Sequence, residues 1–517
     1  MEKMIEGRTY KGLRNGRYAI ILYLATLILG FFSRRAFIDN IGAEVLGMNA
    51  TAMNLLGFLN IAELGIGSAV AFSLYKPLSE INTEEIREIV MVQGYLYKKI
   101  AYIIIGAATV LMLFFPVIFN NISFPLWYTF ATFSAYLYSS LLTYFVNYKQ
   151  IVLTANQEEY KIMYSYKSVL LFQSLCQILA LYLLENGYVW WLVIQFLFAT
   201  LASLSLNYVI KRDYPYLRGL CKLSKEVYHK HKIIITKTKQ LFFHKIGAFV
   251  LEQSSPLIIF AYTSLTMVAI YTNYLLITNG ILLLFGSVCN SVNAGIGNLV
   301  AEGDKKKIMG VFEEIFIIRF FFISVSVYCI YVLSPSFVTL WVGDEYILRN
   351  TTLLIMLGIL FISLIRSTVD GFINAYGAYQ DIYAPVIEAM ISLSCAIALG
   401  YKYGIDGVLS GMFISQLLVI FMWKPYFLFK YAMRESVSYY VLLLMKSAIA
   451  FSISIAISNY AIQNIFAISS SNFFAWMFDA IKVTALISVI LFVLLYSISD
   501  GMKAFASRIY NLVRGGQ

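Results

Sequence analysis

The apolar run at residues 18–38, YAIILYLATLILGFFSRRAFI, decides the class of this protein. At 1.5 Å per residue, a helix over this run is about as long as the hydrocarbon core of a bilayer is thick. A basic N-terminus precedes it, but the run is too long for a signal peptide and lacks a small-residue cleavage site. We therefore predict a retained first transmembrane helix. Arg34 and Arg35 stand near its far end, about 24 Å from Tyr18, where lipid disfavours charge.

The whole composition agrees with a membrane protein. Hydrophobic residues make up 60% of the 517 and charged residues 13%, against about 25% charged in soluble domains. A scan for runs of about 20 mostly apolar residues predicts an all-α fold with about fourteen transmembrane helices. The segments are 18–38, 46–74, 100–119, 126–147, 162–184, 188–210, 240–262, 267–292, 315–334, 352–375, 383–401, 405–429, 438–460 and 473–498.

The distribution of Lys and Arg predicts the orientation. With a cytoplasmic N-terminus, 31 of the 39 basic residues fall at cytoplasmic ends, four at outer ends and four inside segments. We therefore expect a multi-pass protein of the bacterial cytoplasmic membrane with both termini in the cytoplasm. The net charge of +11 is mostly this bias, so we expect no nucleic-acid partner.

A long basic stretch divides the chain. We predict an N-terminal lobe at 1–210, a basic cytoplasmic linker at 211–239 and a second lobe at 240–432, followed by two more helices and a tail at 433–517. Similar motifs, Gly65-Ile66-Gly67-Ser68 and Gly295-Ile296-Gly297-Asn298, end the second span of each lobe, which hints at a parallel repeat. Glycine pairs that only permit close helix packing are the alternative.

Ionisable residues inside spans are candidates for function, because lipid makes them costly. Arg366 and Asp370 are four residues apart and share one helix face, where they form either a buried ion pair or a substrate contact. Arg319 lies about one turn into its span. Helix positions next to each other diverge by 100°, so we expect one of Arg34 and Arg35 to point into the protein, and the sequence leaves open which.

Carboxylates in the spans are candidates for a coupling ion. Glu252 lies near the middle of its span, Glu63 lies in the Asn-rich second span, and Asp370 is the third. We expect no cofactor and no metal site, since the five cysteines show no metal-binding spacing. The sequence leaves open whether transport is electrogenic, driven by the membrane potential, or coupled to antiport of a proton or sodium. Lys446 and Lys482, with Asp479 in the last two spans, form either a structural network or the flank of a lipid groove.

Enzyme chemistry has no visible support in this sequence. The longest outer loops, 335–351 and 461–472, carry no histidine and no carboxylate pair suited to acid–base catalysis. There is no P-loop lysine motif and no Ser-His-Asp grouping. These absences argue against an O-antigen polymerase or ligase, and transport is the default interpretation.

Three features together carry a family resemblance: the fourteen spans, the Arg-bearing first helix followed by IGAEVLGMNATAMNLLGFLNIAELGIGSAVAFSLYKPL, and GNLVAEGDKKK after the eighth span. In these the chain resembles the Wzx-like O-antigen and polysaccharide flippases of the multidrug/oligosaccharidyl-lipid/polysaccharide (MOP) exporter superfamily. The resemblance extends over essentially the whole chain.

The resemblance implies two six-helix lobes in a V around a central cavity, with two additional C-terminal helices. It implies export of undecaprenyl-pyrophosphate-linked oligosaccharide units to the outer leaflet by alternating access, with the polysaccharide polymerase machinery as a partner. It places first-helix arginines, here Arg34 and Arg35, at the pyrophosphate, and a lipid-tail groove beside the last two helices. We group Arg319 and Arg366 with them as cavity cations, since guanidinium groups bind phosphate oxygens bidentately.

Two alternatives share the same fold. A cation-coupled multidrug exporter usually has twelve spans and an acidic cation-binding site. The fourteen predicted spans and the arginines inside them argue against this alternative. A lipid II flippase differs from the leading interpretation only in the glycan part of its cargo.

Overall fold

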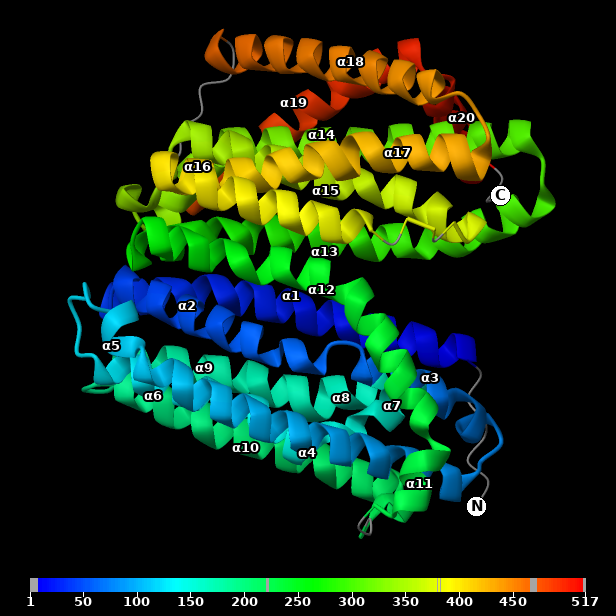
Figure 1. Cartoon of the computed structure of the whole chain (residues 1–517). Coiled ribbons are helices and arrows are strands. Elements are labelled where there is room, and N and C mark those ends of the chain that lie inside the picture. The colour runs from blue at the N-terminus through cyan, green and yellow to red at the C-terminus, as the bar shows by residue number, and fades with distance from the viewer. Residues whose placement is uncertain (1–7, 220–222, 379, 382, 465–471, 515–517) are drawn as a thin grey trace. The chain divides into compact units, whose positions relative to one another are not determined.

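The computed structural model describes residues 8–219, 223–378, 380–381, 383–464 and 472–514. All regular secondary structure in these ranges is helical, which confirms the predicted all-α class (Figure 1). Contacts between residues divide the chain into two compact units, Met1–Asn273 and Tyr274–Gln517. The predicted division at the 211–239 linker stays a prediction.

The first unit contains the helices of the first seven predicted spans. They are α1 (Arg8–Asn40), α2 (Ala43–Leu59), α3 (Ile66–Ser79), α4 (Thr83–Leu113), α5 (Phe115–Ile118), α6 (Trp127–Phe145), α7 (Ile151–Ala155), α8 (Glu159–Ile162), α9 (Ser168–Leu183), α10 (Gly187–Asp213), α11 (Lys225–Lys230) and α12 (Lys232–Tyr262). Helix α12 packs against α2 and α3, and the interior is filled by aromatic contacts such as Phe115 against Phe133.

The second predicted span is broken. The segment 46–74 folds as α2, a single 3-10 turn at Asn60–Glu63, and α3. Gly65 precedes α3 with a φ of 91°, a left-handed conformation that glycine adopts without steric cost. The matching motif at Gly295 continues inside an unbroken helix, so the two motifs share sequence but not backbone conformation.

The second unit contains α14 (Lys305–Val342), α15 (Asn350–Tyr376), α16 (Ala384–Ser415), α17 (Lys424–Phe427), α18 (Val437–Asn464), α19 (Phe473–Ile498) and α20 (Asp500–Arg514). Helix α13 (Leu265–Glu302) begins in the first unit and contributes most of its length to the second. Phe312 is fully buried in the second unit, with its ring against Phe372 and Phe429.

Helix α16 reverses direction at Gly404, where φ is 56° and ψ is −132°. A Cβ added to Gly407 would lie 2.1 Å from the carbonyl oxygen of Leu399, and one on Gly411 would lie 2.3 Å from the amide nitrogen of Ala396. These pairs show two antiparallel helical arms in close contact. The predicted segments 383–401 and 405–429 are therefore separate helices joined by a tight turn, and π-helical turns carry the second arm on to α17.

Replacing Gly407 with alanine is expected to destabilise the protein. The new methyl group would strike backbone, which cannot rotate away, so the two arms must separate at a cost of about 1–3 kcal/mol. The measurement is the melting midpoint of the detergent-solubilised protein by fluorescence-detected size-exclusion chromatography. Gly106→Ala is the matched control, because its Cβ meets nothing within 4 Å. Equal midpoints for the two variants would contradict the tight turn.

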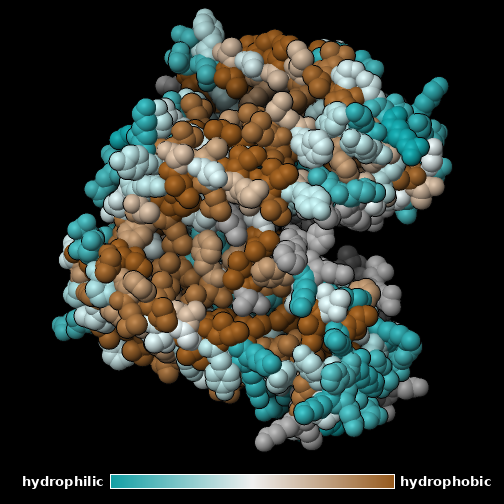
Figure 2. Space-filling view, viewed as in Figure 1, coloured by the Kyte–Doolittle hydropathy of each residue, from teal (hydrophilic) through white to brown (hydrophobic). Residues whose placement is uncertain are grey.

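Ten helices in the described ranges are long and apolar enough to cross a membrane, so this is a multi-pass membrane protein. Helical structure covers all fourteen predicted segments, but the exact count of fourteen spans stays a prediction. In each unit, hydrophobic side chains gather over the middle of the helices and hydrophilic ones lie toward the helix ends (Figure 2). This is the pattern that a bilayer requires.

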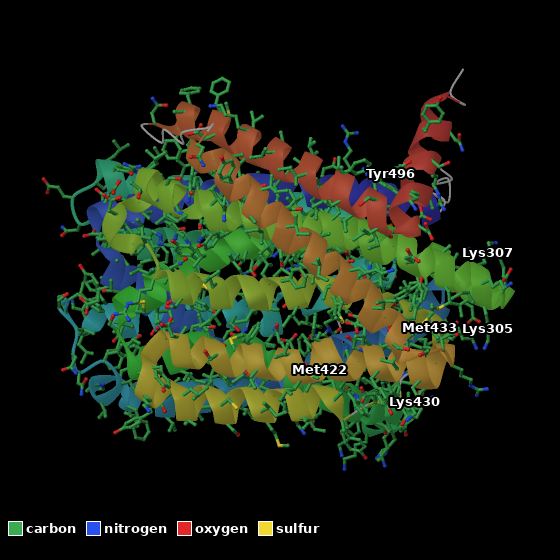
Figure 3. The ribbon with its side chains drawn as sticks, turned by 90° about the horizontal axis from the view of Figure 1, so that it is seen from above. Lys305, Lys307, Met422, Lys430, Met433 and Tyr496 are labelled. Carbon is green, nitrogen blue, oxygen red and sulfur yellow. The ribbon has the colours of Figure 1, made fainter. Side chains whose placement is uncertain are left out.

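The orientation can be tested at three turns. Lys305, Lys307 and Lys430 lie at the same end of the second unit, as the positive-inside rule demands (Figure 3). We expect reporters fused at Lys306 to respond as cytoplasmic, and reporters fused at Gly187 and Tyr403 to respond as external. A reversed response at any one of these positions would contradict the predicted topology.

Candidate functional site

Arg34 points into the first unit. Its Nη1 donates to Asn273 Oδ1 at 2.7 Å and to Thr272 Oγ1 at 3.0 Å, both on α13. Asn273 is fully buried, and its Nδ2 has no hydrogen-bond partner in the described part of the chain. Because the acceptors are neutral and no carboxylate among the described residues pairs with Arg34, the guanidinium keeps its net positive charge.

Arg35 points outward instead. Its side chain is 47% exposed and its Nε lies 3.4 Å from Asp39 Oδ2, one turn further along α1. Tyr182 also donates to this carboxylate, at 3.4 Å. The structure thus separates the adjacent arginines: Arg34 lies among neutral polar groups of the protein, and Arg35 forms an exposed ion pair.

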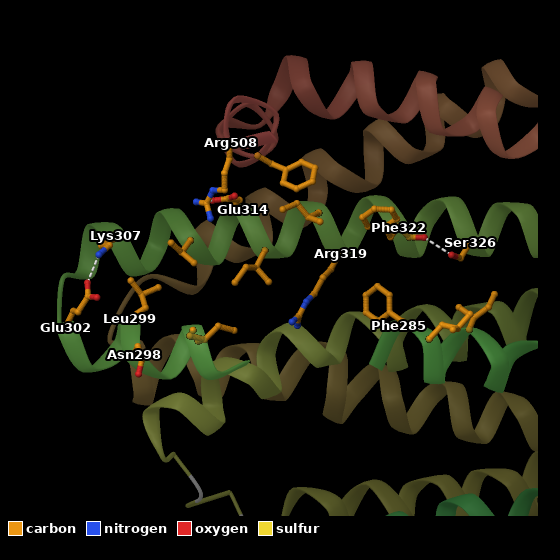
Figure 4. Close-up of a pocket in the computed structure, with 18 residues that line it drawn as sticks. Phe285, Asn298, Leu299, Glu302, Lys307, Glu314, Arg319, Phe322, Ser326 and Arg508 are labelled. Carbon is orange, nitrogen blue, oxygen red and sulfur yellow. Dashed lines mark hydrogen bonds and ion pairs between the residues drawn. The ribbon is translucent and has the colours of Figure 1, made fainter. Parts of the chain in front are cut away.

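Arg319 on α14 lines a groove of the second unit. The groove has a volume of about 870 Å³ and runs between α13 and α14 (Figure 4). Most of its lining is apolar, with Ile281, Leu284, Phe285, Ile315, Ile318 and Phe322 among the contributing residues. Arg319 is only 5% exposed and donates to Ser367 Oγ at 3.3 Å. A buried cation therefore lies in the middle of a groove whose lining is mostly apolar.

Ion pairs lie at the rim of this groove. Lys307 Nζ and Glu302 Oε2 are 2.5 Å apart, and Arg508 Nη2 donates to Glu314 Oε2 at 2.8 Å (Figure 4). Arg508 and Phe505 come from α20, which lies in the predicted cytoplasmic tail.

Glu313 fixes the start of α20. Its Oε1 accepts hydrogen bonds from Gly501 N and Ser499 Oγ, both at 3.0 Å, and its Oε2 accepts one from Tyr439 at 2.5 Å. A carboxylate that accepts a hydrogen bond from an amide in the first turn of a helix stabilises that end of the helix. The C-terminal helix is therefore a structural wall of the groove.

Arg366 and Asp370 form the predicted ion pair, with Nε and Oδ2 2.6 Å apart. A second cation was not predicted to lie here: Lys424 Nζ lies 2.7 Å from the other oxygen, Asp370 Oδ1. Glu388, which is buried nearby on α16, was not predicted either. Both residues are ionisable and lie inside predicted spans, which is the same sequence signal that identified the other candidates.

The remaining predicted residues have different surroundings. Glu63 accepts hydrogen bonds from Tyr97 at 2.8 Å and Tyr144 at 2.7 Å, at the break between α2 and α3. The side chain of Glu252 lies outside the described residues, although its backbone belongs to α12.

The lysines of the last two helices do not meet at one site. Lys482 pairs with Asp479 on α19 at 3.2 Å, and Lys446 is exposed on α18. Their roles at a lipid groove stay a prediction.

Comparison with family models finds no match, and comparison with curated proteins finds none either. Solved structures do match. Lipid II flippase MurJ in an inward closed conformation aligns with a TM-score of 0.64 and 16% identity over 92% of this chain and 99% of its own.

Two transporters of the MOP superfamily match as well. An inward-facing multidrug resistance MATE transporter gives a TM-score of 0.59 at 13% identity, over 77% of this chain and 94% of its own. A transporter from Pyrococcus furiosus gives 0.53 at 12% identity, over 84% of this chain and 100% of its own. This membrane protein therefore has the fold that these flippases and exporters share.

Proposed function

We propose that this protein is a flippase that moves undecaprenyl-pyrophosphate-linked oligosaccharide units from the cytoplasmic to the outer leaflet by alternating access, for surface polysaccharide synthesis. The proposal depends most on one observation, the buried Arg319 in a largely apolar groove of about 870 Å³. Such a groove suits a ligand that carries both hydrocarbon and negative charge. A cationic drug would be repelled by Arg319.

The first unit supplies a second group of donors. Arg34 keeps its charge, and the unpaired Nδ2 of Asn273 lies on the same amide group that Arg34 contacts. Two neighbouring donors are well suited to phosphate oxygens, and a guanidinium binds such oxygens more strongly than neutral donors do. In this proposal each unit offers its own cation to phosphate oxygens, Arg34 in the first and Arg319 in the second, and Arg366 is held by Asp370.

Transport by the purified protein tests the proposal. The protein is reconstituted in vesicles with a fluorescent undecaprenyl-pyrophosphate oligosaccharide, and a membrane-impermeant quencher reports the leaflet. We expect rapid exchange between leaflets with protein and slow exchange without it, and no uptake of ethidium, a cationic dye. Dye uptake without lipid exchange would overturn the proposal in favour of a multidrug exporter.

A lipid II flippase is the second candidate, since MurJ aligns over nearly its whole length. The same vesicles prepared with fluorescent lipid II separate the two candidates. Exchange of lipid II alone would assign the protein to peptidoglycan precursors, and exchange of the oligosaccharide lipid alone would support the leading proposal.

A further inference from the structure

A cluster of four charged side chains lies in the second unit, and none of them lines the groove. Arg366 and Asp370 come from α15, Glu388 from α16 and Lys424 from α17. The cluster joins three helices whose sequence positions span about sixty residues. If all four groups are ionised, its net charge is zero.

Asp370 is fully engaged in this cluster. One of its oxygens lies 2.6 Å from Arg366 Nε, and the other lies 2.7 Å from Lys424 Nζ. Two adjacent cations stabilise the ionised carboxylate and oppose its protonation. They also repel a sodium ion, which would have to displace both of them to reach the same oxygens.

Glu388 is in the opposite situation. Its side chain is buried, with the residue only 3% exposed, and no group in the described part of the chain donates a hydrogen bond to it. The charged groups that act on it are Arg366, Lys424 and Asp370, and neither cation lies within ion-pair distance. A buried carboxylate without donors is costly when ionised, and binding a proton removes that cost.

We propose that Glu388 is the proton-binding group of this transporter and that its second unit takes a proton rather than sodium as the coupling ion. The carboxylate of Glu388 takes a proton from hydronium and leaves water, and the net charge of the cluster changes from zero to +1. A change of one charge among three packed helices gives the two protonation states different interaction energies, which a coupled transporter requires. Glu388 lies one turn from the start of α16, at the end predicted to face the cytoplasm.

The inference extends the proposed transport function by naming the coupling ion. Its test does not use the cargo, so the two can fail separately. The full-length protein in detergent is treated with dicyclohexylcarbodiimide, which modifies protonated carboxyl groups in apolar surroundings, over a pH series that spans neutrality. Modified residues are located by mass spectrometry. We expect modification of Glu388 that falls as pH rises, with Asp370 unmodified at every pH.

Infrared difference spectroscopy gives a second, independent readout. We expect Glu388→Gln to lose one titrating carboxylic-acid band, Asp370→Asn to retain it, and replacement of potassium by sodium at fixed pH to leave it unchanged. Labelling at Asp370 instead of Glu388, or a sodium-dependent band, would overturn the proposal. The carbodiimide experiment uses the wild-type protein, so its result does not depend on whether a variant folds.

Discussion

Replacing Arg34 with alanine is expected to lower export of the lipid-linked oligosaccharide at least about 30-fold. A guanidinium with neutral protein partners can pass its charge-assisted hydrogen bonds to phosphate, and truncating such a partly buried, hydrogen-bonded cation costs about 2 kcal/mol or more. The measurement is the leaflet exchange rate of the fluorescent lipid in vesicles that contain equal amounts of protein. Arg34→Lys, which keeps the charge but loses the bidentate geometry, should give an intermediate rate.

Arg35→Ala is the matched control for Arg34. The two residues are adjacent on α1, but Arg35 forms an exposed pair with Asp39, and such pairs contribute about 0–1 kcal/mol. We expect less than about a fivefold change in the exchange rate. Equal losses from both single variants would mean that the structure does not distinguish their roles. Normal export by both single variants and by the double variant would remove the pyrophosphate role altogether.

Replacing Arg319 with methionine is expected to have a comparably large effect. Methionine keeps most of the side-chain length and fills the groove, so the substitution removes the charge with little loss of packing. We expect an exchange rate at least about 30-fold lower, because the only deeply buried cation lining the described groove is lost. The rate should fall while the melting midpoint of the protein changes little.

Lys307→Met provides the control at the same groove. Lys307 lies at the rim with its side chain 54% exposed, and its partner Glu302 is equally exposed. Removing this charge should change the rate by less than about fivefold, as for other surface ion pairs. A rate lost equally in Lys307→Met and Arg319→Met would indicate that the groove responds to overall charge and not to a buried contact.

The helical class could be predicted from the sequence because apolar runs of about 20 residues have few other folds available in lipid. Helices occur in every predicted segment, and the boundary between 383–401 and 405–429 falls at the turn around Gly404. The break at Gly65 was not predicted. A hydropathy scan averages over residues and does not see a left-handed glycine.

The candidate site was only partly predictable. Charge within an apolar run identified Arg319, Arg366 and Asp370 as candidates, and the i, i+4 spacing indicated the shared helix face on which Arg366 and Asp370 form an ion pair. The partner of Arg34 could not be predicted, because Thr272 lies 238 residues away and only tertiary packing brings it to α1. Lys424 was counted among the basic residues at cytoplasmic helix ends. Its long side chain nevertheless allows its ammonium group to reach Asp370.

The deciding test of the flippase proposal uses a strain that lacks this gene, with mass spectrometry of extracted undecaprenyl-pyrophosphate glycans. We predict that one defined oligosaccharide unit accumulates on that lipid, and that the wild-type gene clears it while the Arg34→Ala gene does not. This result would also identify the cargo. A deletion strain with no accumulated lipid-linked glycan and with unchanged surface polysaccharide would contradict the flippase proposal.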